Sequence, residues 1–179
     1  MTNEPPVRNE DAGKMPGATR FQVPPPLEAE VNGLLERYPQ KRSAVLMVLH
    51  ALQEHFGFIS KEAMAWTAQK LGLQPINVLE LVTFYPMFRQ EPIGRFHFRI
   101  CRTLSCALGG SHQIYQHFCE KLGLDSHAHG PQTTKDGKFT VEFVECLASC
   151  HTAPVLLCND QFHETVTVEK AEGILAQCV

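Results

Sequence analysis

The purely helical hydrophobic period of the chain ends between Glu91 and Gly94. Before this point apolar residues recur every three or four positions, which is the pattern of amphipathic helices. After it, the stretch RFHFRIC (residues 95–101) alternates apolar and polar side chains, as a half-buried strand does. Because the two periods suit different elements, we expect a helical bundle domain over residues 27–92 and a sheet-containing domain over residues 93–179.

The first domain is predicted to contain four helices. Their ends are marked by residues with known cap preferences, since Ser60 suits an N-cap, Gly57 and Gly72 suit C-caps, and Pro75 suits a first turn. The last helix, PINVLELVTFYPMF, is apolar enough that we expect it to be buried on more than one side. At least two of its three aromatic residues are expected in the core: Phe84, Tyr85 and Phe88.

The second domain is predicted to be an α+β sandwich, with the order strand, helix, strand, strand, helix. An Asp-Gly turn precedes its second strand, in which Phe139, Val141 and Phe143 share one side. The other expected elements are a helix over 109–123, a loop over 125–134, a short buried strand within 153–160 and a closing helix over 167–179.

Residues 1–26 hold half of the chain's twelve prolines and almost no apolar periodicity, which predicts a disordered tail. They lack the apolar core of a secretory signal and carry acidic residues that transit peptides avoid. The longest apolar run, AVLMVL, is far shorter than the ~20 residues that span a bilayer. We therefore expect a cytoplasmic protein without direct membrane insertion. A net charge of −3 and no basic stripe argue against a nucleic-acid partner.

Four of the seven cysteines fall at the ends of predicted elements. Cys101 closes the first strand and Cys106 precedes the next helix, which makes a C-x4-C pair. Cys146 closes the following strand and Cys150 lies in the loop after it, which makes a C-x3-C pair. Loops at the ends of strands converge at one edge of a sheet, where binding sites commonly lie.

A disulfide, a structural zinc ion and a thiol redox centre each fit these cysteine pairs less well than an iron–sulfur cluster does. A disulfide within either pair would be strained, and cytosolic chains keep their thiols reduced. Structural zinc accepts such spacings, although it usually holds together small units that lack a core. A thiol–disulfide oxidoreductase normally shows C-x-x-C, which neither pair is.

A [2Fe–2S] cluster fits best, because its two irons take four thiolates in all, two on each iron. Gly109 and Gly110 are expected at a helix N-terminus, where they bring backbone N–H groups and the positive end of the helix dipole to the cluster. Thr103, Ser105 and Ser149 are candidate hydroxyl donors. The other three cysteines are predicted to be small core residues: Cys119, Cys158 and Cys178.

From about Tyr38 to its C-terminus the chain resembles a known family, the 24 kDa subunits of NADH:quinone oxidoreductase, or respiratory complex I. The resemblance is carried by RYPQKRSAVLMVLHALQEHFGFIS, VTFYPMF, PIGRFHFRICRTLSC and VECLASCHTAPV, together with the cysteine pattern. The chain departs from the family at Ala148 and His151, where family members often have Gly.

The resemblance implies a helical bundle followed by a thioredoxin-like ferredoxin domain with one [2Fe–2S] cluster. Cys101 and Cys106 would then hold one iron, and Cys146 and Cys150 the other. It also implies a partner subunit that binds FMN and NADH, within a larger complex peripheral to the bacterial inner membrane. The cluster would exchange single electrons with that flavin, so the chain would be an electron-carrying subunit without a substrate site.

Two alternatives stay open from the sequence. Relatives with the same cysteine pattern serve NAD-linked hydrogenases and formate dehydrogenases, so the host complex is not decided. A zinc-stabilised structural module is the alternative outside electron transfer. The chain has no G-x-G-x-x-G fingerprint after a strand, so we do not expect it to bind NADH itself.

Overall fold

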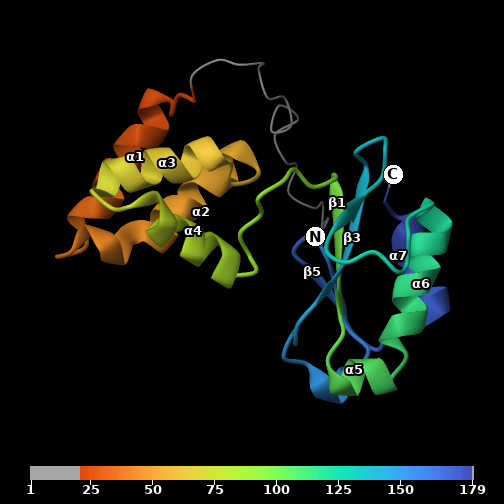
Figure 1. The fold of residues 1–179 in the computed structure, drawn as a ribbon. Helices are drawn as coiled ribbons and strands as arrows, with labels where there is room; N and C mark the ends of the chain where they lie inside the picture. Colours follow the sequence, from red (N-terminus) through yellow and green to blue (C-terminus); the bar gives the residue numbers. More distant parts are fainter. Residues whose placement is uncertain (1–20, 179) are drawn as a thin grey trace, which may run out of the picture. The chain divides into compact units, whose positions relative to one another are not determined.

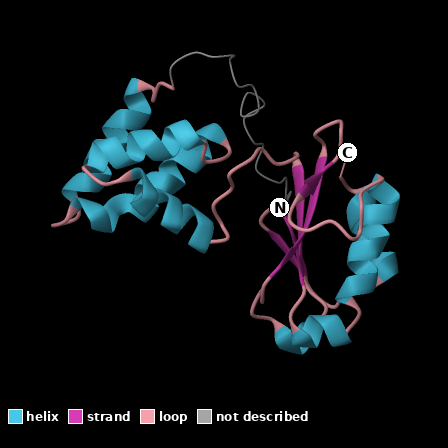
Figure 2. Ribbon diagram, viewed as in Figure 1, coloured by secondary structure: helices cyan, strands magenta, loops and turns pink. Residues whose placement is uncertain are grey.

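The structure is a computed structural model that describes residues 21–178. The chain divides into two compact units, one ending at Pro92 and the other beginning at Ile93. The first unit is helical and the second contains a sheet with helices (Figure 2). No helix among the described residues is long and apolar enough to cross a membrane.

Over residues 21–92, the helical unit contains four α-helices and one 3-10 turn: α1 (Pro25–Glu36), η1 (Lys41–Ala44), α2 (Val45–Phe56), α3 (Lys61–Leu71) and α4 (Pro75–Phe84). The predicted cap residues are confirmed. The Ser60 hydroxyl accepts a hydrogen bond from the Ala63 N–H at 3.1 Å, and Gly57 and Gly72 end their helices with φ of 82° and 70°. Side chains of one buried cluster join the helices, among them Val31, Leu49, Leu52, Ile59 and Val78.

The prediction of a disordered tail over residues 1–26 was wrong for residues 21–26, which the structure describes. Residues 1–20 lie outside the described part of the chain, but α1 already begins at Pro25, because proline is well suited to the first turn of a helix. Phe21 and Val23 pack against the helical core, and the rings of Phe21 and Phe56 lie 5.1 Å apart. Apolar contacts therefore order residues just before α1, which a count of prolines does not reveal.

The prediction that the last helix is buried on more than one side was wrong. Val78 and Val82 are its buried residues, whereas Ile76 and Phe84 are 62% and 76% exposed. Of the three aromatic residues, Phe88 is buried, Tyr85 is half-buried and Phe84 is exposed. The composition of a helix records how much apolar surface it has, but the elements packed on it decide how much of that surface is covered.

The sheet unit contains five strands in the order β2-β3-β1-β4-β5. β1 pairs with β3 in parallel, and the three other pairings are antiparallel. The helices α6 and α7 pack together on one face of this sheet (Figure 1). The strands are β1 (Phe96–Cys101), β2 (Gln132–Thr133), β3 (Phe139–Val144), β4 (Leu156–Cys158) and β5 (Gln161–His163). The other elements are α5 (Leu104–Leu108), α6 (Ser111–Leu122), η2 (Cys150–Thr152) and α7 (Val168–Ala176).

The α+β class and the main order of elements are confirmed, but four short elements were missed. β2 and η2 lie in predicted loops, β5 follows the last predicted strand, and α5 precedes the first helix predicted in this unit. Segments of two to five residues are too short to show a hydrophobic period, so only their partners define them.

The predicted alternation places Phe96, Phe98 and Ile100 on the side of β1 that packs against the helices. The prediction of a half-buried strand was wrong, because His97 on the other side is only 2% exposed. Phe98 and Ile100 of β1 are fully buried, and the Phe98 ring lies 4.5 Å from that of Phe118 on α6. Val141 of β3 and Leu156 of β4 complete the layer beneath the helices. This core fixes β1 and β3 in one register, in which Cys101 pairs with Val144 at the last position.

Close backbone approach at Gly94 leads to the first prediction. The Gly94 N–H donates to the Thr140 hydroxyl at 2.7 Å, and a Cβ on Gly94 would lie 2.7 Å from the Phe139 carbonyl carbon. We expect Gly94→Ala to lower the free energy of unfolding of the sheet unit by about 1–3 kcal/mol, because backbone must move. Urea unfolding followed by circular dichroism measures the change.

Gly173 in α7 is the matched control, because an added Cβ there has nothing within 4 Å. Gly173→Ala is expected to raise the free energy of unfolding by about 0.5–1 kcal/mol, since alanine suits a helix better. Equal effects of the two substitutions would contradict the steric argument.

Candidate metal centre

The fold brings all four predicted cysteines to one end of the sheet. β1 and β3 run in parallel and end side by side, so the segments that follow them leave from the same edge. Cys101 is the last residue of β1, and Cys106 lies in α5 just beyond it. Cys146 follows β3, and Cys150 begins η2, which packs against α5 (Figure 1).

The thiols meet as two pairs. The sulfur atoms of Cys146 and Cys150 are 3.8 Å apart, and the thiols of Cys101 and Cys106 lie close enough to shift each other's pKa. The pairs also influence each other electrostatically, since charge on Cys150 raises the pKa of Cys106 and charge on Cys101 acts to raise that of Cys146. In residues 21–178, no three His, Cys, Asp or Glu side chains surround a single point as one metal ion would require.

The two pairs differ in burial. Cys101 and Cys106 are each 1% exposed and pack against Val155, whereas Cys146 and Cys150 are exposed. Burial, together with the neighbouring Cys101 thiol, raises the pKa of Cys106 to about 11. The centre therefore has one side in the protein interior and one side at the surface.

Hydrogen bonds favour the thiolate form of two other cysteines. Burial acts to raise the pKa of Cys101, but hydrogen bonds from the Thr103 hydroxyl and the Leu147 backbone outweigh it and hold the pKa below its ordinary value. The pKa of Cys146 is lowered first by the Ala148 N–H, which donates to its sulfur at 3.3 Å.

The Thr103 hydroxyl lies between the two pairs. Its oxygen is 3.2 Å from the sulfur of Cys101, and the same hydroxyl also lowers the pKa of Cys146. This predicted donor is confirmed in its position. Ser149 is not aimed at a sulfur, because its hydroxyl donates to Glu164 at 2.9 Å and its oxygen lies 2.7 Å from the Thr152 hydroxyl. Ser105 lies inside α5.

Gly110 is the N-cap of α6, as predicted, but the expectation that the N–H groups of Gly109 and Gly110 serve a cluster was wrong. The Gly109 N–H donates to the Ser105 carbonyl at 3.0 Å and the Gly110 N–H to the Ala107 carbonyl at 3.2 Å. Because the sequence did not predict α5, it also did not predict that the end of this helix uses these N–H groups. Gly109 instead allows a close approach of Pro154, whose ring would lie 3.2 Å from an added Cβ.

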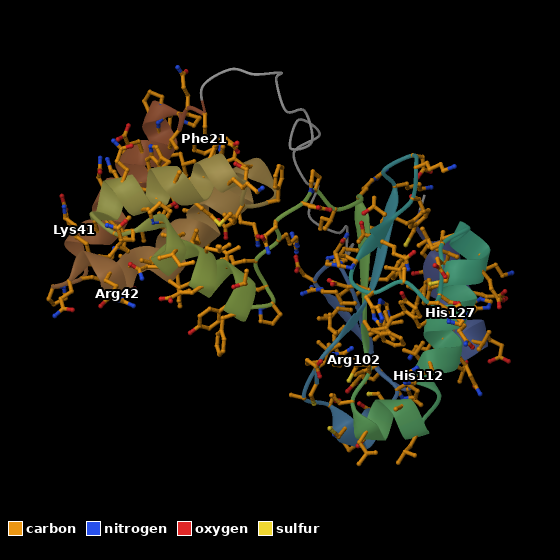
Figure 3. All side chains as sticks on the ribbon, viewed as in Figure 1. Phe21, Lys41, Arg42, Arg102, His112 and His127 are labelled. Atoms are coloured by element: carbon orange, nitrogen blue, oxygen red, sulfur yellow. The ribbon has the colours of Figure 1, made fainter. Side chains whose placement is uncertain are left out.

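An ion pair joins the two cysteine segments. Arg102 follows Cys101, Glu145 precedes Cys146, and the Arg102 guanidinium donates to Glu145 through Nε at 2.9 Å and Nη2 at 2.5 Å. Figure 3 shows Arg102 at the end of the sheet nearest α5. Opposite charges beside two cysteines were visible in the sequence, but only the strand register makes them neighbours. Both side chains are exposed, so the pair orients the segments more than it stabilises them.

The family model for thioredoxin-like [2Fe-2S] ferredoxins matches residues 31–179. The chain belongs to this family. The predicted thioredoxin-like fold class is thereby confirmed.

Relatives of this ferredoxin chain are subunits of NADH–quinone oxidoreductases. It is 36% identical over 149 residues to an NADH–quinone oxidoreductase subunit of Rhizobium meliloti, covering 83% of this chain and 86% of that protein. It is 38% identical over 144 residues to another such subunit, from Thermus thermophilus, and the match covers 78% of this chain and 77% of that protein. The sequence resemblance to this family of oxidoreductase subunits is confirmed.

Among solved structures, the chain is similar to the NAD+-reducing [NiFe]-hydrogenase in the air-oxidized state, with a TM-score of 0.63 and 19% identity. The match covers 75% of this chain and 22% of the hydrogenase chain. At this identity the similarity shows a shared fold.

Backbone strain beside Cys146 leads to the second prediction. Ala148 has a φ of 62°, in the left-handed region that glycine adopts most easily. We expect Ala148→Gly to raise the free energy of unfolding of the sheet unit by up to about 1 kcal/mol, because relief of strain exceeds the added chain entropy. Urea unfolding measures the change.

Ala107→Gly is the control, because Ala107 lies in α5 with helical neighbours. That substitution is expected to lower the free energy of unfolding by about 1 kcal/mol, because glycine is a poor helix former. A loss of stability in both variants would show that Ala148 is not strained.

Proposed function

We propose that this chain is an electron-transfer subunit of an NADH–quinone oxidoreductase, in which four cysteines hold one [2Fe–2S] cluster. Cys101 and Cys106 are assigned to one iron, and Cys146 and Cys150 to the other. The observation that carries the proposal is the convergence of two thiol pairs at the shared end of β1 and β3. Family membership and the names of the relatives support it.

The donor set fits a two-iron cluster better than a single zinc ion. Zinc in a structural site needs four ligands around one point, whereas these thiols meet two by two. Four thiolates, two on each iron, satisfy a [2Fe–2S] cluster. The Thr103 hydroxyl and the Ala148 N–H supply donors to the negative sulfurs.

When bound, such a cluster accepts and releases one electron at a time. The residues of this chain anchor it on one side and leave it accessible on the other. Cys101 and Cys106 hold it from the protein interior, where Val155 excludes water. Cys146 and Cys150 lie at the surface, where an electron donor or acceptor can approach.

The partner in this proposal is a subunit that binds FMN and NADH, within a larger membrane-associated complex at the cytoplasmic face of the bacterial inner membrane. An apolar surface beside the thiols supports a protein partner. Leu104 and Leu108 of α5 are 74% and 81% exposed, and they lie on the helix that carries Cys106. Exposed apolar groups beside a redox site are typical of a docking surface. We further propose that residues 27–92 and 93–179 are separate domains of this protein.

Metal content and electron paramagnetic resonance test the function. We expect the anaerobically prepared protein to contain about two irons and two sulfides per chain and to show a spin-half signal after dithionite. Cys101→Ser should alter or abolish this signal. Cys119→Ser is the control, since Cys119 is buried in the core of the sheet unit. A colourless protein with one zinc per chain would overturn the proposal.

Association measurements test the partner surface. We expect Leu108→Glu to weaken binding to the flavin-binding subunit by about tenfold or more, because a charge would be buried in an apolar contact. The iron content should not change. Lys135→Glu is the control, as Lys135 is exposed in the turn that precedes β3, at the far end from the cysteines. Equal weakening by both variants would point to net charge instead of this surface.

A further inference from the structure

The segment that carries Cys150 is held by residues that follow β5. Ser149 and Thr152 flank Cys150 and His151, and both hydroxyls bond to one carboxylate oxygen of Glu164. The distances to Glu164 Oε1 are 2.9 Å from Ser149 Oγ and 2.8 Å from Thr152 Oγ1. A single side chain distant in sequence thus joins both ends of the turn around this cysteine.

Backbone contacts add to this link. The Thr165 N–H donates to the Thr152 carbonyl at 2.7 Å, and the Thr152 N–H donates to the Ser149 carbonyl at 3.2 Å. The hydroxyls of Ser149 and Thr152 also lie 2.7 Å apart. The turn is therefore closed on itself and attached to the segment between β5 and α7.

Hydrogen bonds matter here because packing cannot place this cysteine. Cys101 and Cys106 are buried, so the core limits their movement, but Cys150 is exposed. An exposed side chain has few neighbours to restrict it, and its position depends on the backbone that carries it. That backbone is the turn whose two hydroxyl-bearing residues Glu164 contacts.

Glu164 is itself held in place. Its backbone carbonyl accepts a hydrogen bond from Lys170 Nζ at 2.5 Å. The hydroxyls of Thr152 and Ser149 lower the pKa of its carboxyl group, with a smaller contribution from His151. The side chain is thus a fixed acceptor for two donors.

We propose that Glu164 is a positioning residue for the metal centre, which fixes Cys150 by accepting hydrogen bonds from Ser149 and Thr152. The inference rests on the proposed function, because it takes Cys150 as a ligand. Two substitutions separate the acceptor oxygen of Glu164 from its charge. Glutamine keeps an oxygen acceptor in the same place, whereas alanine removes it.

The first measurement uses the metal-free protein and hydrogen exchange. In Glu164→Ala we expect the amide of Thr152 to exchange about tenfold faster or more, because its turn loses its link to Glu164. In Glu164→Gln the exchange rate of the Thr152 amide should stay within about twofold of the wild-type rate, since an oxygen acceptor remains. Unchanged exchange in Glu164→Ala would overturn the proposal, whatever the metal content.

The second measurement uses the iron-loaded protein. Glu164→Ala should lose iron to a chelator about tenfold faster than the wild type and show a broadened resonance signal, and Glu164→Gln should restore both. Ser149→Ala removes one of the two donors to Glu164 and should therefore show a smaller increase in iron loss and signal width. Glu169→Ala on α7 is the control and should show none.

The outcomes distinguish this inference from the proposed function. If the wild type binds no iron–sulfur cluster, the proposed function and the metal-positioning role both fail, even where exchange responds to Glu164→Ala. If the wild type binds the cluster and Glu164→Ala retains it as firmly, the inference alone fails.

Discussion

The parallel pairing of β1 with β3 is the interaction on which the site depends. In this register Cys101 and Val144 are the last paired residues, so the two cysteine segments begin side by side. Were the strands antiparallel, the segment after β3 would begin at the other end of β1, about 20 Å away for six residues. A parallel pair needs a crossover connection, and α6 supplies it while burying Ile114 and Phe118 against the sheet.

The two halves of the centre are held by different kinds of force. Cys101 and Cys106 are placed by the apolar core, which resists movement because it is closely packed. Cys146 and Cys150 are placed by polar contacts at the surface, which include the Arg102–Glu145 ion pair and the hydrogen bonds to Glu164. The buried pair is therefore rigid, whereas the order of the exposed pair depends on a few hydrogen bonds. The exposed pair is also the side that a partner can reach.

Several features could be predicted from single residues because their cause is local. Ser60, Gly57 and Gly72 begin or end helices through their own backbone and side-chain preferences, and the alternation around Phe98 shows which side of β1 packs against α6. Where the prediction failed, the cause lay in a neighbour. The N–H groups of Gly109 and Gly110 are used by α5, and the apolar surface of α4 is left uncovered by the elements around it.

The sequence by itself determined the class of the fold, the change from helices to a sheet near Glu91, and the four cysteines with their spacing. These follow from hydrophobic period and residue chemistry, which act over a few positions. Only the tertiary structure decided which pair is buried, that Thr103 lies between Cys101 and Cys146, and that Glu164 holds the turn around Cys150. Such contacts join residues far apart in the chain, and they exist only once strand register and core packing have placed both partners.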